Sequence, residues 1–104
     1  MPLAPASVVD RVSAAISTAA LRHEVIAANI SNRDAQGYQR MKLAFEDALG
    51  GHASPVVVPD TAPAGASLEQ DLMDLSANAM RYESMTRMLG RYFSILGAIA
   101  GNRG

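Results

Sequence analysis

The 104-residue sequence contains no cysteine and no tryptophan. The absence of cysteine excludes a disulfide framework and a thiolate metal site, and it is compatible with an oxidising compartment without requiring one. Only two histidines are present, His23 and His52. His23 has no neighbour at a metal-ligand spacing except Glu24, which lies on another face of a helix, and His52 falls in a loop. We therefore expect no metal site and no cofactor.

An excess of charge of either sign is also lacking. Nine Lys and Arg residues against ten Asp and Glu residues give a net charge of -1, so no basic face predicts nucleic-acid binding. No set of Ser, His and Asp indicates a hydrolase, and the Gly50-Gly51 pair lacks the Lys-Ser or Lys-Thr that follows in a phosphate-binding loop. We expect that the protein is not an enzyme.

Long apolar runs are missing as well. The charge-free stretch 92–101 near the C-terminus has ten residues, about half of what a transmembrane helix needs. The N-terminal residues do not show a basic segment leading into a long apolar run, which is the pattern of a cleavable secretory signal. We expect neither a membrane span nor a cleaved signal peptide.

The sequence does contain two long segments with helical periodicity, and the first is predicted as a helix over residues 7–32. Ser7 is its expected N-cap, with Asp10 at the capping-box position. Apolar residues at alternating spacings of three and four form a stripe typical of a coiled coil. The stripe consists of Val9, Val12, Ile16, Ala19, His23, Ile26 and Ile30. A second apolar group lies roughly opposite and consists of Ala14, Leu21, Val25 and Ala28.

The second predicted helix covers residues 67–101. Ser67 is its expected N-cap with Gln70 at the capping-box position, and Glu69 and Asp71 place negative charge at the positive end of the helix dipole. One stripe with the same alternation consists of Leu68, Leu72, Leu75, Ala79, Tyr82, Thr86, Leu89, Phe93, Leu96 and Ala100. A further stripe, roughly opposite, consists of Met73, Ala77, Met80, Met88, Ile95 and Ile99. This helix, too, has two apolar faces.

Between the helices, the polar residues of SNRDAQG at 31–37 predict a helix end and a turn, because Asn, Asp and Gly tolerate left-handed backbone conformations. We expect an extended segment through Lys42, followed by one or two helical turns that end at Gly50 and Gly51. Residues 50–66 hold three prolines and three glycines. They predict a linker or surface loop with at most a brief strand at 56–58.

The expected fold is all-α, with residues 1–104 forming a single domain. Helices 7–32 and 67–101 would pair as a coiled-coil hairpin, and residues 33–66 would supply the turn, the short middle segment and the Gly/Pro-rich loop. Each helix would keep one apolar stripe exposed, so a free monomer would be marginally stable and partners would cover the rest. A compact bundle with the middle segment as a third helix is the alternative.

Two parts of the sequence resemble the axial proteins of the bacterial flagellum. In LRHEVIAANISNRDAQGY, residues 21–38, the chain is similar to the family motif ANIAN, two variable residues, then TPGY. The matching positions are Ala28, Asn29, Ile30, Asn32, Gly37 and Tyr38. Ala35 and Gln36 depart from the motif, since the family commonly has Thr and Pro there, and the turn should be less rigid for that reason.

The C-terminal segment, residues 67–99, is similar to that of the FlgB family of proximal rod proteins. The similar positions are Glu69, Asn78, Ala79, Tyr82, Ala98 and Ile99. The two segments together cover more than half of the chain. The sister family FlgC usually has extra residues inside the N-terminal motif and a different sequence around the C-terminal tyrosine. FlgB is therefore favoured, and a FlgC-like rod subunit is the alternative.

The resemblance implies a structural subunit of the proximal rod, in which many copies pack helically into a tube. It implies contacts with other copies, with FlgC, FlgF, FlgG and FliE, and with the membrane-ring base, but not with nucleic acid. It also implies a place in the basal body, in the rod that spans the periplasm, after export without cleavage through the flagellar type III apparatus. The residues expected in assembly and packing are Met73, Met80, Tyr82, Met88, Leu89, Phe93, Ile95, Leu96 and Ile99.

A hypothesis from another class is a small soluble helical module, such as a dimeric regulator or adaptor, that uses the same stripes for one partner. The rod hypothesis predicts an isolated chain that is monomeric or weakly associated, with frayed terminal helices. A stable, fully helical dimer would favour the module. Asn29 and Asn32 also have a plain structural interpretation as helix-end caps.

Overall fold

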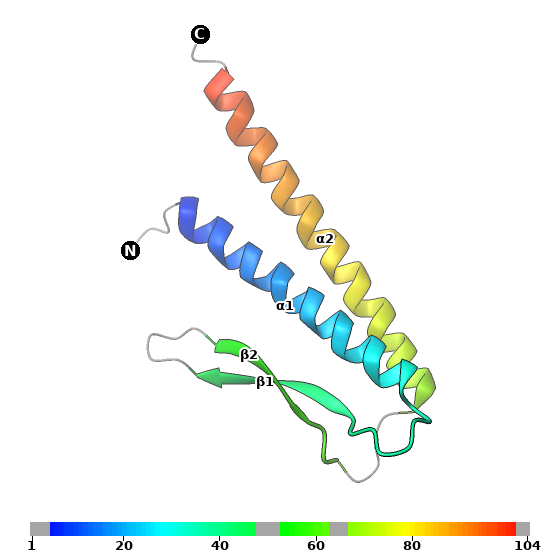
Figure 1. Cartoon of the computed structure of the whole chain (residues 1–104). Helices are drawn as coiled ribbons and strands as arrows, with labels where there is room; N and C mark the ends of the chain where they lie inside the picture. Colours follow the sequence, from blue (N-terminus) through cyan, green and yellow to red (C-terminus); the bar gives the residue numbers. More distant parts are fainter. Residues whose placement is uncertain (1–4, 48–52, 63–66, 102–104) are drawn as a thin grey trace.

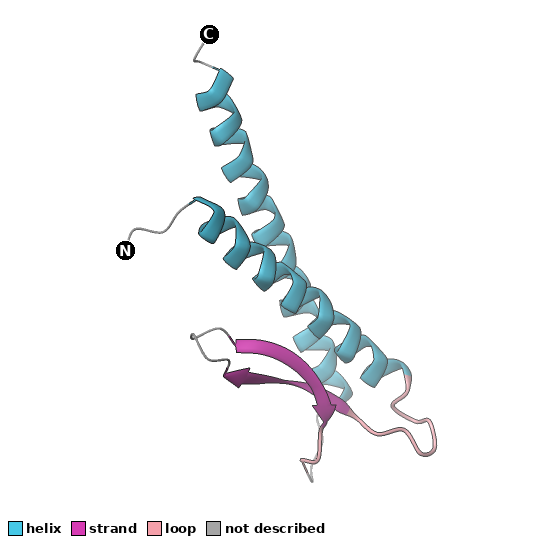
Figure 2. Cartoon of the chain, turned by 60° about the vertical axis from the view of Figure 1, so that its left-hand side comes forward, coloured by secondary structure: helices cyan, strands magenta, loops and turns pink. Residues whose placement is uncertain are grey.

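The computed structural model describes residues 5–47, 53–62 and 67–101. The chain forms two helices and a two-stranded antiparallel sheet in the order α1 (Pro5–Ser31), β1 (Met41–Asp47), β2 (Ala53–Pro59) and α2 (Leu68–Gly101) (Figure 1). The helices run in opposite directions. They lie together where α1 ends and α2 begins, and they separate toward the N-terminus of α1 and the C-terminus of α2 (Figures 1 and 2). The molecule is elongated, with extents of 63 × 31 × 16 Å.

The prediction of an all-α chain is wrong for the middle of the sequence. Residues 43–47, expected in helical turns, belong to β1, and residues 53–59, expected mainly as loop, form β2. The alternative with a third helix is wrong for the same reason. Apolar side chains alternate in β1 at Met41, Leu43 and Phe45, which is the two-residue period of a strand. The expected helix end at Gly50-Gly51 lies outside the described residues.

The prolines of β2 fit this hairpin because of their register. Pro59 lies opposite Met41 and Pro55 opposite Phe45. The backbone N–H of Asp60 donates to the carbonyl of Arg40 at 2.7 Å, and hydrogen-bonded pairs recur at every second residue of an antiparallel ladder. Both prolines therefore stand at positions whose missing N–H would have pointed away from β1, so the ladder loses no bond.

The helix boundaries are close to the predicted ones. The first helix begins at Pro5, so Ser7 lies inside it rather than at its N-cap, and it ends one residue before Asn32. At α2 the predicted N-cap is confirmed, because the N–H of Gln70 donates to Ser67 Oγ at 3.1 Å. The Gln70 side chain donates to Asp74 instead of returning to Ser67, so half of the capping box is formed. Neither helix, over its described residues, has a segment long and apolar enough to cross a bilayer.

The predicted stripe of α1 faces inward, but of the predicted stripe of α2 only Leu75 and Leu89 lie inward. In α1 the buried or half-buried stripe members are Val9, Val12, Ile16, Ala19, Ile26 and Ile30, whereas His23 is exposed. In α2 the buried or half-buried residues are Asp71, Leu75, Asn78, Met85, Leu89 and Tyr92. The predicted members Leu72, Ala79, Thr86 and Phe93 are exposed, and in each case the preceding residue lies inward. A hydrophobic pattern misses this face because it does not count Asp71 and Asn78.

Candidate functional site

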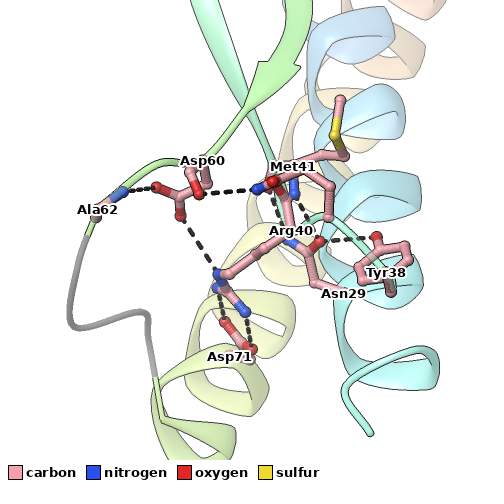
Figure 3. Close-up of polar contacts among 8 residues, drawn as sticks. Asn29, Tyr38, Arg40, Met41, Asp60, Ala62 and Asp71 are labelled. Atoms are coloured by element: carbon pink, nitrogen blue, oxygen red, sulfur yellow. Dashed lines mark hydrogen bonds and ion pairs between the residues drawn. The ribbon is translucent and has the colours of Figure 1, made fainter. Parts of the chain in front are cut away.

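The motif residue Asn29 is the centre of a polar network at the end of α1, where it is 4% exposed. Its side-chain Nδ2 donates to the carbonyl of Met41 at 2.7 Å, and its Oδ1 accepts from the N–H of Met41 at 3.0 Å (Figure 3). The amide thus pairs with β1 as a peptide group of a neighbouring strand would. The Tyr38 hydroxyl donates to the same Oδ1 at 2.9 Å. Asn29 is therefore a connector of helix, turn and strand, and not only a helix-end cap.

The turn that brings Tyr38 to Asn29 starts with a local cap. Asn32 donates through both its backbone N–H and its Nδ2 to the carbonyl of Ala28, at 3.0 and 2.9 Å. The N–H of Ala35 then donates to the Asn32 carbonyl, and that of Tyr38 to the Ala35 carbonyl. Gly37 has φ +81°, the sole positive φ among the described residues. A Cβ there would meet no atom within 4 Å, so backbone conformation rather than space requires the glycine.

The motif residues play unequal parts in this arrangement. Tyr38 and Asn29 are in direct contact, and Asn32 closes the helix onto Ala28. Ile30 supplies the carbonyl that accepts from the N–H of Arg33 at 3.3 Å. The cap interpretation is confirmed for Asn32. For Asn29 it is incomplete, because two of the three hydrogen bonds of its amide join Met41, twelve residues away in β1.

A bidentate ion pair ties the hairpin to α2. The Arg40 guanidinium donates to both carboxylate oxygens of Asp71, at 2.8 and 2.5 Å, and its Nε donates to Asp60 at 3.3 Å (Figure 3). The Asp71 side chain is 3% exposed and that of Arg40 is 24% exposed. Hydrogen bonds from Arg40 hold the pKa of the Asp71 carboxyl below its ordinary value of 3.8, against the opposing effect of burial. The same pair raises the pKa of Arg40, so the bridge stays charged.

Sequence reasoning did not find this ion pair. The sequence predicts that Asp71 places negative charge at the positive end of the helix dipole, and it indicates no role for Arg40. The two residues are 31 positions apart, and only the hairpin brings them together. No local spacing in the sequence could have indicated the contact, because the strand pairing that creates it is itself non-local.

A third polar contact joins the helices directly. Asn78 is 3% exposed, and its Nδ2 donates to the carbonyl of Ala19 at 2.7 Å. The Ala19 side chain is also 3% exposed. The Asn78 Oδ1 is buried and has no hydrogen-bond partner among the described residues. The sequence placed Asn78 only by its similarity to the rod proteins and assigned it no contact.

An open cleft of about 450 Å³ lies between the hairpin and the two helices. Its charged lining residues are Arg22, Arg40, Lys42, Asp60, Asp71, Asp74 and Arg81. The described residues contain no group of three or more His, Asp or Glu side chains that could hold a metal ion. Among the residues that line the cleft, Asn29 joins α1 to β1, and Arg40 joins Asp60 to Asp71 of α2. These hydrogen bonds within the chain indicate a structural role.

The residues expected in assembly lie elsewhere, along the outside of α2. Leu89 is half-buried, whereas the others are exposed. The exposed ones are Met73, Met80, Tyr82, Met88, Phe93, Ile95, Leu96 and Ile99. The molecule therefore has an internally bonded polar network at the base of the hairpin and an apolar surface on α2 that the described part of the chain does not cover.

Comparison with known protein families gave no matching family model, and comparison with curated proteins gave no match.

Proposed function

We propose that the protein is a structural subunit of a larger assembly and works by packing its helices against neighbouring subunits. The observation that carries this proposal is the set of exposed apolar side chains along α2, from Met73 to Ile99. Monomeric soluble proteins rarely expose extensive apolar surface, and such surface marks interaction sites. Met80 and Met73 are 66% and 65% exposed, so their side chains are not part of the core of this chain.

The particular assembly we infer is the rod of the bacterial flagellum, with the chain as a proximal rod subunit similar to FlgB. The N-terminal motif supports this inference, because its residues Asn29, Gly37 and Tyr38 act together to direct the chain out of α1. This function requires contacts with neighbouring copies of the chain, with FlgC, FlgF, FlgG and FliE, and with the membrane-ring base. The location would be the basal body, reached by export without a cleaved signal.

We also infer that α1 and α2 pair as a coiled-coil hairpin over the part where they lie together. The inward positions of α2 follow spacings of four and three, as in a coiled coil, except that Tyr82, between Asn78 and Met85, is exposed. The inward residues are Asp71, Leu75, Asn78, Met85, Leu89 and Tyr92. In the assembly, neighbouring helices would cover the ends of α1 and α2 that separate.

The proposal is tested by placing a charge on the exposed surface with Met80→Glu. A buried unpaired carboxylate at a subunit contact is costly, so the variant should fold normally but not assemble. We expect unchanged helical circular dichroism of the purified chain and loss of swimming when the variant replaces the chain in its source bacterium. Ser17→Glu, at an exposed position on the polar face of α1 that also carries Asp10 and Glu24, is the control and should keep motility. Normal motility of Met80→Glu would contradict the proposed assembly surface.

A further inference from the structure

In its N-terminal half, α2 packs on α1 through the less apolar of two neighbouring faces. Leu72 and Ala79 are exposed, while Asp71 and Asn78, each one residue earlier, are buried. One residue corresponds to a rotation of about 100° around the helix. Apolar burial would favour Leu72 over Asp71 and Ala79 over Asn78. Further along α2, the observed face buries Met85 and exposes Thr86. The apolar burial of Met85 partly offsets the apolar burial that is lost at Leu72 and Ala79.

Two polar contacts hold the observed face inward. Asp71 binds the Arg40 guanidinium through both oxygens, and Asn78 donates to the backbone carbonyl of Ala19. The two residues are seven positions apart and therefore lie on the same side of α2, two turns from each other. Arg40 directly precedes Met41, which Asn29 fixes, so the contact to α2 starts from a part of the hairpin that is itself held in place.

Neither of these two polar contacts gives the folded chain the greatest stability that residues at these positions could provide. Asn78 Oδ1 is a buried acceptor without a partner among the described residues, and an unsatisfied buried acceptor costs free energy. Replacement of a buried ion pair by well-packed apolar residues is often neutral or stabilising. What a buried polar contact contributes in paired helices is specificity, because it can be satisfied in one arrangement and not in others.

We propose that Asp71 and Asn78 set the rotation of α2 about its own axis. Their two contacts turn the face that contains them toward α1, and they leave Leu72 and Ala79 facing outward. The chain thereby keeps apolar residues on its surface that hydrophobic packing alone would bury. The inference concerns contacts within one chain and does not depend on the proposed function.

The test uses the natural absence of cysteine, which makes single thiol reporters unambiguous. Met85→Cys and Thr86→Cys place a thiol at adjacent positions, the first half-buried and the second exposed. In the otherwise unchanged full chain, the thiol at position 86 should react with a maleimide several-fold faster than the thiol at position 85. A rotation of α2 toward the Leu72 face would reverse the exposure of the two positions.

The decisive variant is Asp71→Leu/Asn78→Leu, which removes both polar contacts and leaves apolar residues. We expect its helical circular dichroism to be retained below its melting temperature, which should fall because Arg40 loses its partner Asp71. The two alkylation rates should converge to within about twofold, since several rotations then have similar free energy. The matched control is Asp74→Leu/Arg81→Leu, which adds the same two leucines, also seven positions apart, at exposed sites of α2. This control should keep the several-fold difference.

Three results would overturn the inference. The first is a several-fold difference that persists in Asp71→Leu/Asn78→Leu, because apolar packing would then set the rotation. The second is convergence in the control as well, because added leucine alone would then be sufficient. The third is loss of helical structure in Asp71→Leu/Asn78→Leu, because the polar pair would then be required for stability rather than for orientation.

Discussion

At the scale of single residues, Asn29 uses both groups of its side-chain amide on the backbone of Met41. The Tyr38 hydroxyl completes the set by donating to the same oxygen. A side chain with only acceptors, or with only donors, could not satisfy the N–H and the carbonyl of Met41 together. This explains in physical terms why an asparagine, and not merely a polar residue, stands at this position.

The Asn29→Asp substitution tests that explanation. It keeps the shape of the side chain but replaces the donor to the Met41 carbonyl with a second acceptor, so we expect a loss of unfolding free energy of about 1–3 kcal/mol. Urea denaturation followed by circular dichroism measures the loss. Asn32→Asp makes the same chemical change at the C-terminal end of α1 and should cost less, about 1 kcal/mol, because the backbone N–H of residue 32 still donates to the Ala28 carbonyl. Equal losses in the two variants would contradict the connecting role of Asn29.

The ion pair of Asp71 predicts a dependence of stability on acidity. Because Arg40 lowers the folded-state pKa of Asp71 below 3.8, the pair contributes its full stability above that value. The contribution is lost as the pH falls through the folded pKa. Asp71→Asn, which lacks the charge, should be about 2 kcal/mol less stable near neutral pH. The difference between the two proteins should shrink as the pH falls below 3.8, as measured by urea midpoints. A difference that stays constant with pH would contradict the assignment.

At the scale of elements, the turn between α1 and β1 contains one glycine in a left-handed conformation, Gly37. Gly37 carries this conformation with open space around its Cα, so an added methyl group would clash with nothing and would only strain the backbone. Gly90, inside α2, also has open space but a helical backbone. The same substitution should therefore have opposite effects at the two sites.

We expect Gly37→Ala to lower the free energy of unfolding by about 1 kcal/mol, because alanine resists the positive φ. Gly90→Ala should raise it by up to about 1 kcal/mol, because alanine favours a helix. Thermal unfolding of the purified chains followed at 222 nm, the wavelength of helical circular dichroism, gives both values. Stabilisation by Gly37→Ala would show that the turn does not need its left-handed residue.

The elements also show where prediction from sequence succeeds and where it stops. Both helices follow from apolar residues spaced three and four apart, and the cap at Ser67 follows from its residue type. The hairpin does not follow from the sequence, because the prolines and glycines of residues 50–66 indicate a loop. Pro55 and Pro59 interrupt no ladder bond in the register that forms, and that register cannot be deduced from local composition.

The candidate site, like the fold, could be predicted from the sequence only in part. The motif around Asn29 and Tyr38 was found from sequence, because its residues lie close together along the chain. The contacts of Arg40 with Asp71 and of Asn78 with Ala19 were not, since they depend on how distant elements meet. These two contacts also explain why the inward face of α2 was predicted one residue away from its observed position.

At the scale of the whole molecule, the polar contacts and the apolar surface occupy different regions. The base of the molecule, where α1 ends and α2 begins, is joined by Asn29 and Arg40, and Asn78 joins α2 to the middle of α1. Beyond that base the helices separate, and the C-terminal part of α2 exposes Phe93, Ile95 and other apolar residues (Figure 1). A molecule of this form has one end fixed by its own contacts and another end suited to contacts with neighbours.

The most direct measurement for the proposed function is electron microscopy of basal bodies purified from the source bacterium. The account predicts density for this chain in the proximal rod, with the exposed apolar residues of α2, such as Met80 and Ile95, at contacts between subunits. A proximal rod that is complete without this chain, or one in which these residues face solvent, would contradict the account.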